Sequence, residues 1–360
     1  MTSTIKDTAA RATEEQFHPS TVKFAADTAG TPFVSIVIPC LNEERFIGKV
    51  LESLALQYEP GRFEIIVVDG VSTDRTRAVI AGFTSDNPDV QVQVIDNPER
   101  DIPRALNLGI NGARGEIIVR MDAHSIPSPG YVRRCVKLLT ESDAAVVGMP
   151  WKICAGDDSR MARAIALAVA HPFGIGDAKY RLNVSAATYV DTVPFGAFKK
   201  SLWHRLGGFN EKLLANEDYD FNYRVRKDGG LVLLDADEHC NYVARATLDD
   251  LAKQYWRYGS WKAQMVKLKP ASLRWRHLVA PAFVVGLVLT GLLSLVWWPG
   301  FLLFVLTLGS YLLLAIVCSL QLALKQKDLA LLFLLPLIFF SIHLSWGTSF
   351  VAGLFTRRLN

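Results

Sequence analysis

Over residues 33–149, short apolar and β-branched runs alternate with segments whose apolar residues recur at helical spacing. The runs are FVSIVI, EIIVV, VQVQVI, EIIVRM and AAVVGM, and helices are expected between them over 43–57, 74–83, 103–112 and 129–140. Near-continuous apolar strands separated by amphipathic helices are typical of a parallel sheet that is covered on both faces. The pattern therefore predicts a doubly wound, Rossmann-like α/β domain.

The pattern loosens after Trp151. Helices are expected over 159–170 and 216–227, and strands near 187–198 and over 231–237.

The segment 248–266 places Leu251, Tyr255, Tyr258 and Met265 at helical spacing, with basic residues between them. Such a pattern predicts an amphipathic helix that lies on a membrane surface.

Three apolar runs close the chain, over 278–298, 300–324 and 329–355. Each is around or beyond the ~20 residues that a helix needs to cross a bilayer. The first two predict spanning helices. The third contains Pro336 and His343, so a kinked, a re-entrant and a crevice-lining segment all remain open, and the histidine suits either a functional or an interfacial position.

Lysine and arginine gather before the first apolar run and again between the second and the third, which predicts a cytoplasmic N-terminal part. These residues are Lys262, Lys267, Lys269, Arg274 and Arg276, then Lys325 and Lys327. They explain the modest formal charge of +4 and favour anionic lipid headgroups over nucleic acid as partners. Arg357 and Arg358 fall on the opposite side of the membrane if all three runs cross it.

The chain is thus expected to contain a disordered tail (1–31), an α/β domain (32–247), an amphipathic interface helix (248–277) and an α-helical membrane domain (278–356). The five cysteines have no CxxC spacing, so neither a disulfide framework nor a zinc knuckle is expected. No GxGxxG follows the first strand and no GxxxxGK[ST] is present, which excludes dehydrogenase and P-loop NTPase readings.

Two carboxylates follow apolar strands directly, where open α/β sheets bind ligands. Asp69 could accept the N3–H of uracil, a donor that cytosine lacks. The simpler alternative is a turn with Gly70. Asp122 and His124 could converge on one divalent cation if the chain turns after the strand, and this donor pair suits Mn²⁺ at least as well as Mg²⁺. An ordinary loop is the alternative here.

Glu217 and Asp218 open the helix expected over 216–227. The helix dipole favours carboxylates in a first turn, while the functional alternative makes Asp218 a general base. Further along, Arg257 could hold a pyrophosphate with two hydrogen bonds, or it could belong to an interfacial anchor.

Taken in order, these stretches resemble the inverting family 2 glycosyltransferases with a GT-A fold, and among them the succinoglycan-type exopolysaccharide glycosyltransferases, over about residues 34–262. The matching stretches are VSIVIPCLNEE, EIIVVDGVSTDRT, ALNLGINGARGEIIVRMDAH, LGGFNEKLLANEDYDFNYRVRKDGG and QYWRYGSWK.

The resemblance implies a role for each matching residue. Nucleotide-sugar binding would fall to Pro39, Leu41, Glu43, Asp69, Asn107 and Asp122. Asp122 and His124 would hold Mn²⁺ or Mg²⁺, with His124 standing at the third position of the usual D-x-D. Asp218, paired with Glu217, would be the catalytic base. Gln254 and Arg257 would contact the acceptor or the diphosphate, in a motif where Tyr258 replaces the tryptophan of processive synthases.

The expected function is a metal-dependent, inverting transfer from a UDP-sugar, with UDP-glucose favoured. The expected acceptor is a polyprenyl-diphosphate-linked saccharide in exopolysaccharide assembly at the bacterial inner membrane, with the catalytic domain on the cytoplasmic side. A polyprenyl-phosphate glycosyltransferase and a processive synthase are the alternatives within the same chemistry. A non-catalytic nucleotide-sugar-binding subunit of an export complex is the alternative from another class.

Overall fold

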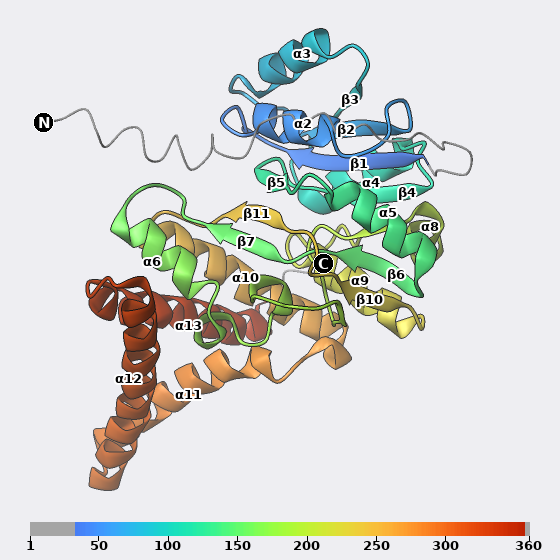
Figure 1. Cartoon of the computed structure of the whole chain (residues 1–360). Helices are drawn as coiled ribbons and strands as arrows, with labels where there is room; N and C mark the ends of the chain where they lie inside the picture. Colours follow the sequence, from blue (N-terminus) through green and yellow to red (C-terminus); the bar gives the residue numbers. More distant parts are fainter. Residues whose placement is uncertain (1–32, 357–360) are drawn as a thin grey trace, which may run out of the picture.

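The computed structural model describes residues 33–356, so the predicted tail (1–31) and the pair Arg357 and Arg358 lie outside the described residues. An α/β domain stands above a set of long C-terminal helices (Figure 1). The strands are β1 Val34–Cys40, β2 Phe63–Asp69, β3 Gln91–Asp96, β4 Ile117–Arg120, β5 Ser125–Pro127, β6 Ala144–Gly148, β7 Trp151–Cys154, β8 Thr188–Tyr189, β9 Ala197–Lys199, β10 Leu231–Leu234 and β11 Cys240–Val243. The helices of the α/β domain are α2 Ile47–Ala55, α3 Thr76–Asp86, α4 Ile102–Gly112, α5 Tyr131–Glu141, α6 Arg160–Ala168, α7 Pro172–Ile175, α8 Lys200–Leu206 and α9 Glu217–Lys227.

The main sheet has the order β3-β2-β1-β4-β9-β6-β10-β8, and a small sheet has the order β5-β11-β7. The α/β prediction is confirmed, but the main sheet is mixed rather than parallel throughout. β9 runs antiparallel to both β4 and β6, and β8 runs antiparallel to β10. The single strand expected near 187–198 is in fact these two short strands, because the chain between them leaves the sheet.

Helices cover both faces of the main sheet, as the apolar strands predict. One buried cluster joins the sheet to α2, α3 and α5, and a second joins its other face to α4, α8 and α9. The strands β1, β2 and β4 have no exposed residue. This two-sided burial fixes the strand register, and with it the positions of the residues at the strand ends.

Helix α10 (Leu248–Leu268) fills the predicted amphipathic segment, but its apolar face is covered by protein rather than left for lipid. Leu251 and Tyr255 are buried in a cluster with residues of α6 and α13, and Met265 is buried beside Leu213 and Tyr219. Contact of α10 with a membrane surface stays a prediction. A helix periodicity shows that one face is buried, but it does not show against what.

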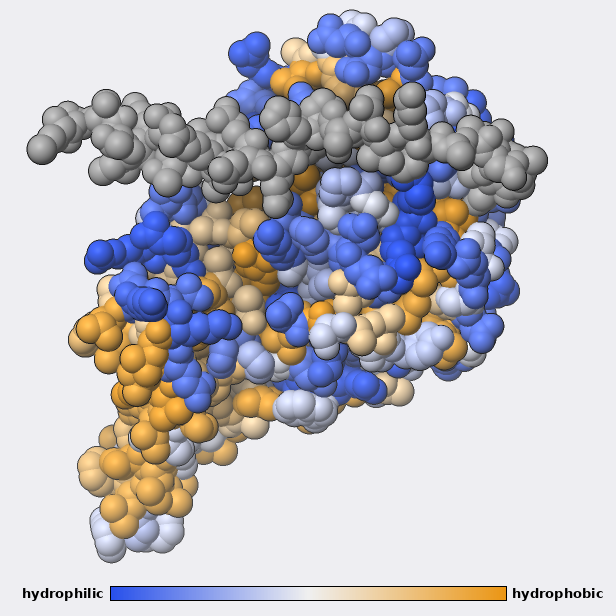
Figure 2. All heavy atoms as spheres, viewed as in Figure 1, coloured by the Kyte–Doolittle hydropathy of each residue, from blue (hydrophilic) through white to orange (hydrophobic). Residues whose placement is uncertain are grey.

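The C-terminal helices are α11 Arg276–Ser294, α12 Trp298–Gln326 and α13 Leu331–Phe355, and all three are long and apolar enough to cross a membrane. They differ in their surroundings. Figure 2 shows apolar side chains covering the projection that α11 and α12 form, and at its tip Leu295 and Val296 are 78% and 83% exposed. In the most apolar stretch of α12 only 11% of the residues are buried, against 33% in α13.

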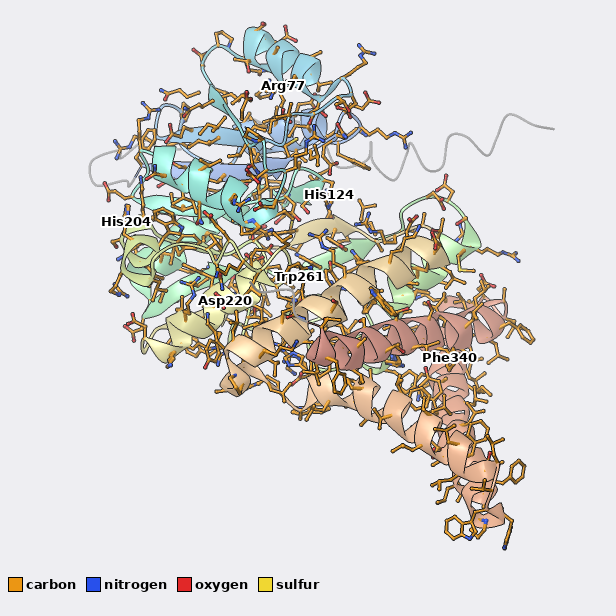
Figure 3. The ribbon with its side chains drawn as sticks, turned by 180° about the vertical axis from the view of Figure 1, so that it is seen from behind. Arg77, His124, His204, Asp220, Trp261 and Phe340 are labelled. Carbon is orange, nitrogen blue, oxygen red and sulfur yellow. The ribbon has the colours of Figure 1, made fainter. Side chains whose placement is uncertain are left out.

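Helix α13 runs across the top of the α11–α12 hairpin and beneath the α/β domain, where it packs on α10 (Figures 1 and 3). It is one unbroken helix through Pro336, so the re-entrant alternative is not seen. His343 is held on both ring nitrogens. Its Nε2–H donates to the Phe173 carbonyl at 2.8 Å, so Nδ1 accepts from the Tyr311 hydroxyl at 2.9 Å. The histidine thereby ties α13 to α12 and to α7.

Candidate active site

Strand ends and one helix start meet at a single edge of the main sheet. The register of β1 against β2 and β4 brings the ends at Cys40, Asp69 and Arg120 together. Residues 122–124 follow β4 directly, and the chain returns to this edge at Glu217, where α9 begins. This is the edge at which open α/β sheets bind ligands.

Arg120 is the centre of a buried ion cluster. Its guanidinium lies 3.1 Å from Asp122 Oδ1, 3.1 Å from Glu217 Oε1 and 2.6 Å from Asp218 Oδ2. The Arg120 side chain is only 4% exposed. One cation therefore links the carboxylate that follows β4 to the carboxylate pair that opens α9.

A second contact fixes His124. The Nδ1 atom of His124 lies 2.9 Å from Glu43 Oε1, so residues near the ends of β1 and β4 hold each other. Figure 3 shows His124 at the lower edge of the main sheet, on the side that faces α10.

A cavity of about 680 Å³ opens below this edge. That volume lies within the range of ligand-binding pockets. Its lining includes Arg120, Asp122, His124, Glu217, Asp218, Gln254 and Arg257. Of the four residues expected to gather around one cavity, Asp122, His124 and Asp218 line it, whereas Asp69 does not.

Comparison with known families decides what this domain is. Residues 35–206 match the family described as "Glycosyl transferase family 2". The chain contains a family 2 glycosyltransferase domain. Arg120, Asp122 and His124 lie inside the matched segment, and the Glu217–Asp218 pair lies just beyond it.

Individual glycosyltransferases extend the similarity beyond that segment. The succinoglycan biosynthesis protein ExoA of Rhizobium meliloti (strain 1021) is 29% identical over 267 residues, 73% of this chain and 78% of that protein. A Methanococcus voltae enzyme, dolichyl N-acetyl-alpha-D-glucosaminyl phosphate 3-beta-D-2,3-diacetamido-2,3-dideoxy-beta-D-glucuronosyltransferase, is 23% identical over 89% of this chain and 97% of its own length.

The fold is shared with a solved structure, a mannosyltransferase from Pyrobaculum calidifontis in complex with GDP-Man and Mn²⁺. The TM-score is 0.64 at 20% identity, and the match covers 92% of this chain and 90% of that one. The domain is thus GT-A-like, and the long helices that follow it belong to the matched architecture.

Asp218 has the electrostatic setting of a group that can exchange a proton near neutral pH. Burial raises its pKa, the Arg120 charge lowers it, and the neighbouring Glu217 and Asp122 raise it again, so that the pKa of Asp218 comes to about 7. A general base works best when its pKa lies near the working pH. This glycosyltransferase therefore has a suitable carboxylate in the cavity.

Asp122 and His124 are the side chains that could hold a divalent metal. Within residues 33–356 no group of three or more His, Cys, Asp or Glu is arranged as a metal site, so other ligands would have to come from a bound diphosphate or from water. The pair fits such a site because carboxylate with imidazole suits Mn²⁺, and Glu43 on Nδ1 leaves Nε2 of His124 as the ligating atom.

The protonation of His124 is set by the same neighbours. Burial alone would lower its pKa, but the Glu43 hydrogen bond and the Asp122 charge together raise the pKa of His124 above its usual value. Metal binding requires the neutral imidazole, so this shift would oppose it.

Asp69 lies at the predicted strand end but is fully buried and engaged within the protein. It accepts hydrogen bonds from the Ser72 backbone N–H at 3.1 Å and from Arg77 Nε at 2.6 Å, and its other oxygen accepts from the Ser72 hydroxyl. The hydrogen bonds with Ser72 are those of a turn, which is the alternative expected for Asp69. Contact with uracil would need Ser72 or Arg77 to yield, whereas Leu41 on the adjacent strand end is 39% exposed. Pro39, within β1, is partly buried.

Asn107 is hydrogen-bonded within the protein, away from the cavity lining. Its amide donates to the Phe209 carbonyl and to Glu211, and its oxygen accepts from the Phe209 backbone N–H and from Trp203. These bonds fasten α4 to the loop that follows α8. The side chain is committed to this loop, and it is not part of the cavity lining.

Gln254 and Arg257 do line the cavity, one turn apart on α10. Gln254 Nε2 donates to the Tyr242 hydroxyl at 3.1 Å, and Arg257 donates to the Leu214 carbonyl at 2.6 Å. Arg257 retains further N–H groups, so it can reach an anion without breaking this bond.

Sequence reasoning missed Arg120, the residue that links the site. It lies within the apolar run EIIVRM and was treated only as part of a strand. A charged residue inside a strand that is buried on both faces is itself the missed signal, because such a charge requires partners.

Proposed function

We propose that this glycosyltransferase transfers one sugar from a nucleoside diphosphate sugar to a lipid-linked acceptor, with inversion at the anomeric carbon, in polysaccharide or lipid-linked glycan biosynthesis. The observation that carries the proposal is the single cavity that holds Asp122, His124 and Asp218, with Arg120 connecting the first and the last.

In the proposed reaction, an acceptor hydroxyl oxygen attacks the anomeric carbon while Asp218 takes the hydroxyl proton. The bond between the anomeric carbon and the diphosphate oxygen breaks, and its electron pair leaves with the nucleoside diphosphate. Arg120 holds Asp218 in position and offsets part of the negative charge of the three carboxylates. Glu217, which shares Arg120, orients the same cluster.

Asp122 and His124 would hold Mn²⁺ or Mg²⁺, which when bound neutralises negative charge on the departing diphosphate. The similarity in fold to a mannosyltransferase solved with Mn²⁺ supports the presence of a metal without fixing its identity here.

UDP-glucose is the first donor to test. The nucleotide base would lie near Pro39, Leu41 and Asp69, the group at the ends of β1 and β2. The structural relative holds GDP-Man, so a donor panel has to include guanine nucleotides.

The membrane attachment proposed here uses α11 and α12 as a spanning hairpin, with α13 lying along the membrane face under the α/β domain. Support comes from the exposed apolar hairpin and from the burial of α13 against α10. This arrangement returns the end of α13 to the side of the α/β domain, whereas three spans would place it on the opposite side of the membrane. We place that side in the cytoplasm of a bacterial cell.

Reporter fusions at the C-terminus test this topology. A fluorescent protein fused there should fluoresce, and an alkaline phosphatase fused there should be inactive. The reverse result would establish three spans.

Purified full-length protein in detergent tests the reaction. With Mn²⁺ and a panel of UDP- and GDP-sugars, at least one donor should yield free nucleoside diphosphate, faster when membrane lipid extract is added. Product size then separates a single transfer from polymer synthesis. No release with any donor and extract would favour a non-catalytic subunit.

A further inference from the structure

The cavity is not confined to the sheet edge. Its lining continues past the carboxylates to Arg181, and then to Phe283, Tyr311 and Leu314 on the membrane helices α11 and α12. A single space thus joins the candidate catalytic base to the part of the molecule that would meet lipid.

Arg181 is the last residue of a short 3-10 helix, Lys179–Arg181, between α7 and β8. Arg181 is buried, with only 7% of the residue exposed. The guanidinium carbon lies 4.8 Å from the centre of the Trp151 ring and 5.8 Å from that of Tyr242, and one N–H donates weakly to the Tyr255 hydroxyl at 3.4 Å. All these neighbours are aromatic.

No Asp or Glu within residues 33–356 forms an ion pair with Arg181. The other two buried arginines of the cavity are paired: Arg120 with three carboxylates, and Arg276 with Asp177 and Asp191. A buried cation is unfavourable unless an anion compensates it, and stacking on rings replaces only part of the lost hydration. An anionic ligand would supply the charge that Arg181 lacks.

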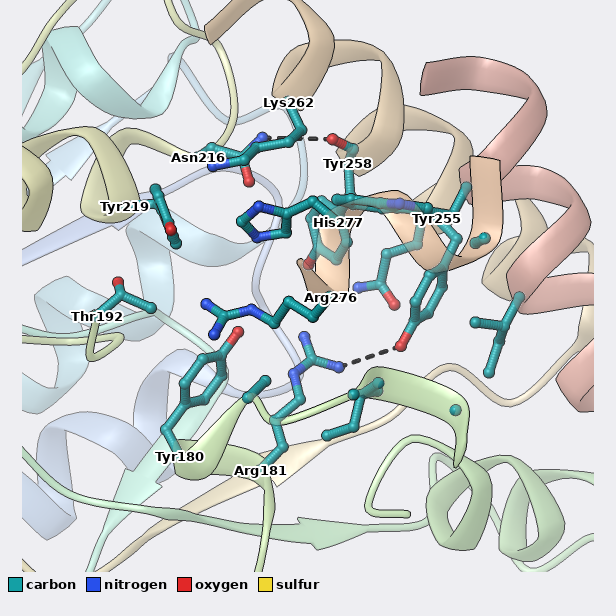
Figure 4. A pocket seen from close by; sticks show the side chains of 18 of the residues that line it. Tyr180, Arg181, Thr192, Asn216, Tyr219, Tyr255, Tyr258, Lys262, Arg276 and His277 are labelled. Atoms are coloured by element: carbon teal, nitrogen blue, oxygen red, sulfur yellow. Dashed lines mark hydrogen bonds between the residues drawn. The ribbon is translucent and has the colours of Figure 1, made fainter. Parts of the chain in front are cut away.

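The surroundings of Arg181 suit an anionic headgroup. Figure 4 shows Arg181 and Arg276 lining the same cavity, with the Arg276 guanidinium directed toward Thr192 and Tyr180. Lys262 is 1% exposed, and its Nζ lies 3.4 Å from the centre of the Tyr219 ring. Burial is the main cause that lowers the pKa of Lys262 to about 6, and the Arg276 charge adds to it. An anion bound nearby would favour the charged form of this amine.

The position of Arg181 distinguishes a lipid from the sugar donor. Trp151 and Tyr242, the rings against Arg181, belong to β7 and β11 of the small sheet, which lies between the main sheet and α13 in Figure 1. A donor diphosphate would lie with Asp122 and His124 at the main sheet. Arg181 is instead held against rings of the small sheet, and the same cavity continues from there to Phe283 and Leu314 on α11 and α12.

We propose that Arg181 binds the phosphate of a polyprenyl phosphate or diphosphate group on the acceptor, with the isoprenoid chain directed along α11 and α12 and the acceptor sugar directed to Asp218. This inference rests on the proposed function for the identity of the acceptor, but the phosphate site can be tested without turnover.

Equilibrium binding of undecaprenyl phosphate to the full-length protein in detergent is the direct test. Wild-type protein should bind it, and Arg181→Gln should bind it about 10- to 100-fold more weakly, the usual effect of losing a charge-assisted hydrogen bond. Arg181→Lys should recover part of the affinity. Arg163→Gln, at an exposed arginine on α6 outside the cavity, is the matched control and should equal wild type.

Two further ligands separate the possible sources of the phosphate. Undecaprenol, which lacks the phosphate, should bind weakly and equally to wild type and Arg181→Gln. Inorganic phosphate should compete only at much higher concentration. Equal binding of undecaprenyl phosphate by wild type and Arg181→Gln would overturn the proposal. So would inorganic phosphate binding as tightly as the lipid, because the site would then serve a free anion.

Fold and reaction are controlled separately. Because Arg181 has no carboxylate to orphan, Arg181→Gln should keep the wild-type Tm, and a lower Tm would identify a structural arginine. If no donor is turned over but Arg181 still governs lipid binding, the proposed function fails while this inference stands.

Discussion

Arg120 and Arg181 line one cavity in opposite electrostatic settings. Arg120 touches three carboxylates, whereas Arg181 touches aromatic rings and a tyrosine hydroxyl. Both side chains are nearly inaccessible to solvent. The comparison shows that burial alone does not indicate the role of a cation. Arg120 pairs with carboxylates of the protein itself, whereas Arg181 is available to bind an anionic ligand.

The strongest effect is expected at the carboxylate end. Asp218→Asn should reduce kcat by about 10²- to 10⁴-fold, because a positioned base contributes that much to catalysis. Arg120 keeps two carboxylate partners in this variant, so the Tm should not fall. Asp228→Asn, at an exposed Asp on the same helix that pairs with Arg205, is the matched control. Wild-type kcat in Asp218→Asn would remove Asp218 from the mechanism.

Substitution of Arg120 and of Arg181 should have different effects on the stability of the protein. Arg120→Gln leaves three carboxylates close together without their cation, so its free energy of unfolding should fall by about 3–5 kcal/mol. Arg181→Gln should show almost no change. Thermal unfolding of both variants in the same detergent measures the difference. Equal losses in the two proteins would break the comparison.

The metal dependence of activity tests the role of Asp122 and His124 at the sheet edge. His124→Ala should raise the Mn²⁺ concentration for half-maximal activity by more than tenfold, and Glu43→Gln should raise it by about tenfold, since partners of a metal ligand usually have the smaller effect. Titration of Mn²⁺ into chelator-treated enzyme provides both numbers. Full activity of His124→Ala in excess chelator would show that no metal acts there.

The pH profile should give the smallest but most specific effect. Because the pKa of Asp218 is raised from 3.8 to about 7, this group is protonated and inactive as a base below that pH. At saturating Mn²⁺, kcat should therefore rise up to about tenfold per pH unit below 7 and level off above it. A flat profile between pH 5.5 and 8 would contradict this.

The raised pKa of Asp218 also makes the stability of the protein depend on pH. Between about pH 4 and 7 the folded chain keeps a proton on Asp218 that the unfolded chain has lost, so this group lowers stability as the pH rises through that window. Asp218→Asn should remove this contribution, and comparing the Tm of both proteins at pH 5 and pH 7.5 measures it.

Periodicity was sufficient for the strands, the helices and the apolar runs, because two-sided burial and bilayer length leave direct traces in sequence. It was not sufficient for β9, a three-residue strand inserted antiparallel between β4 and β6. Strands this short carry little periodic signal.

The candidate site was predictable where motifs place residues at strand ends, as with Asp122, His124 and Asp218. It was not predictable where the partner comes from a distant part of the chain. Arg120 is 98 residues from Asp218, and Arg181 lies in the turn-rich stretch HPFGIGDAKYR, to which no chemistry was assigned. Asn107 shows a different limit of motif-based prediction. It lies within a family motif, but its side chain is hydrogen-bonded to the loop that follows α8.

The packing of α13 has a consequence for how the enzyme can be dissected. Added methyl groups at Gly259, Gly347 or Gly353 would overlap atoms of the neighbouring helix, so α13 is fitted against α10 and α11 at closest range. Truncation of the chain before residue 276 would remove the part of the cavity wall that α11 and α12 form. It would also expose the apolar face of α10. A soluble fragment prepared that way could retain donor chemistry, yet it would have nowhere to seat a lipid tail.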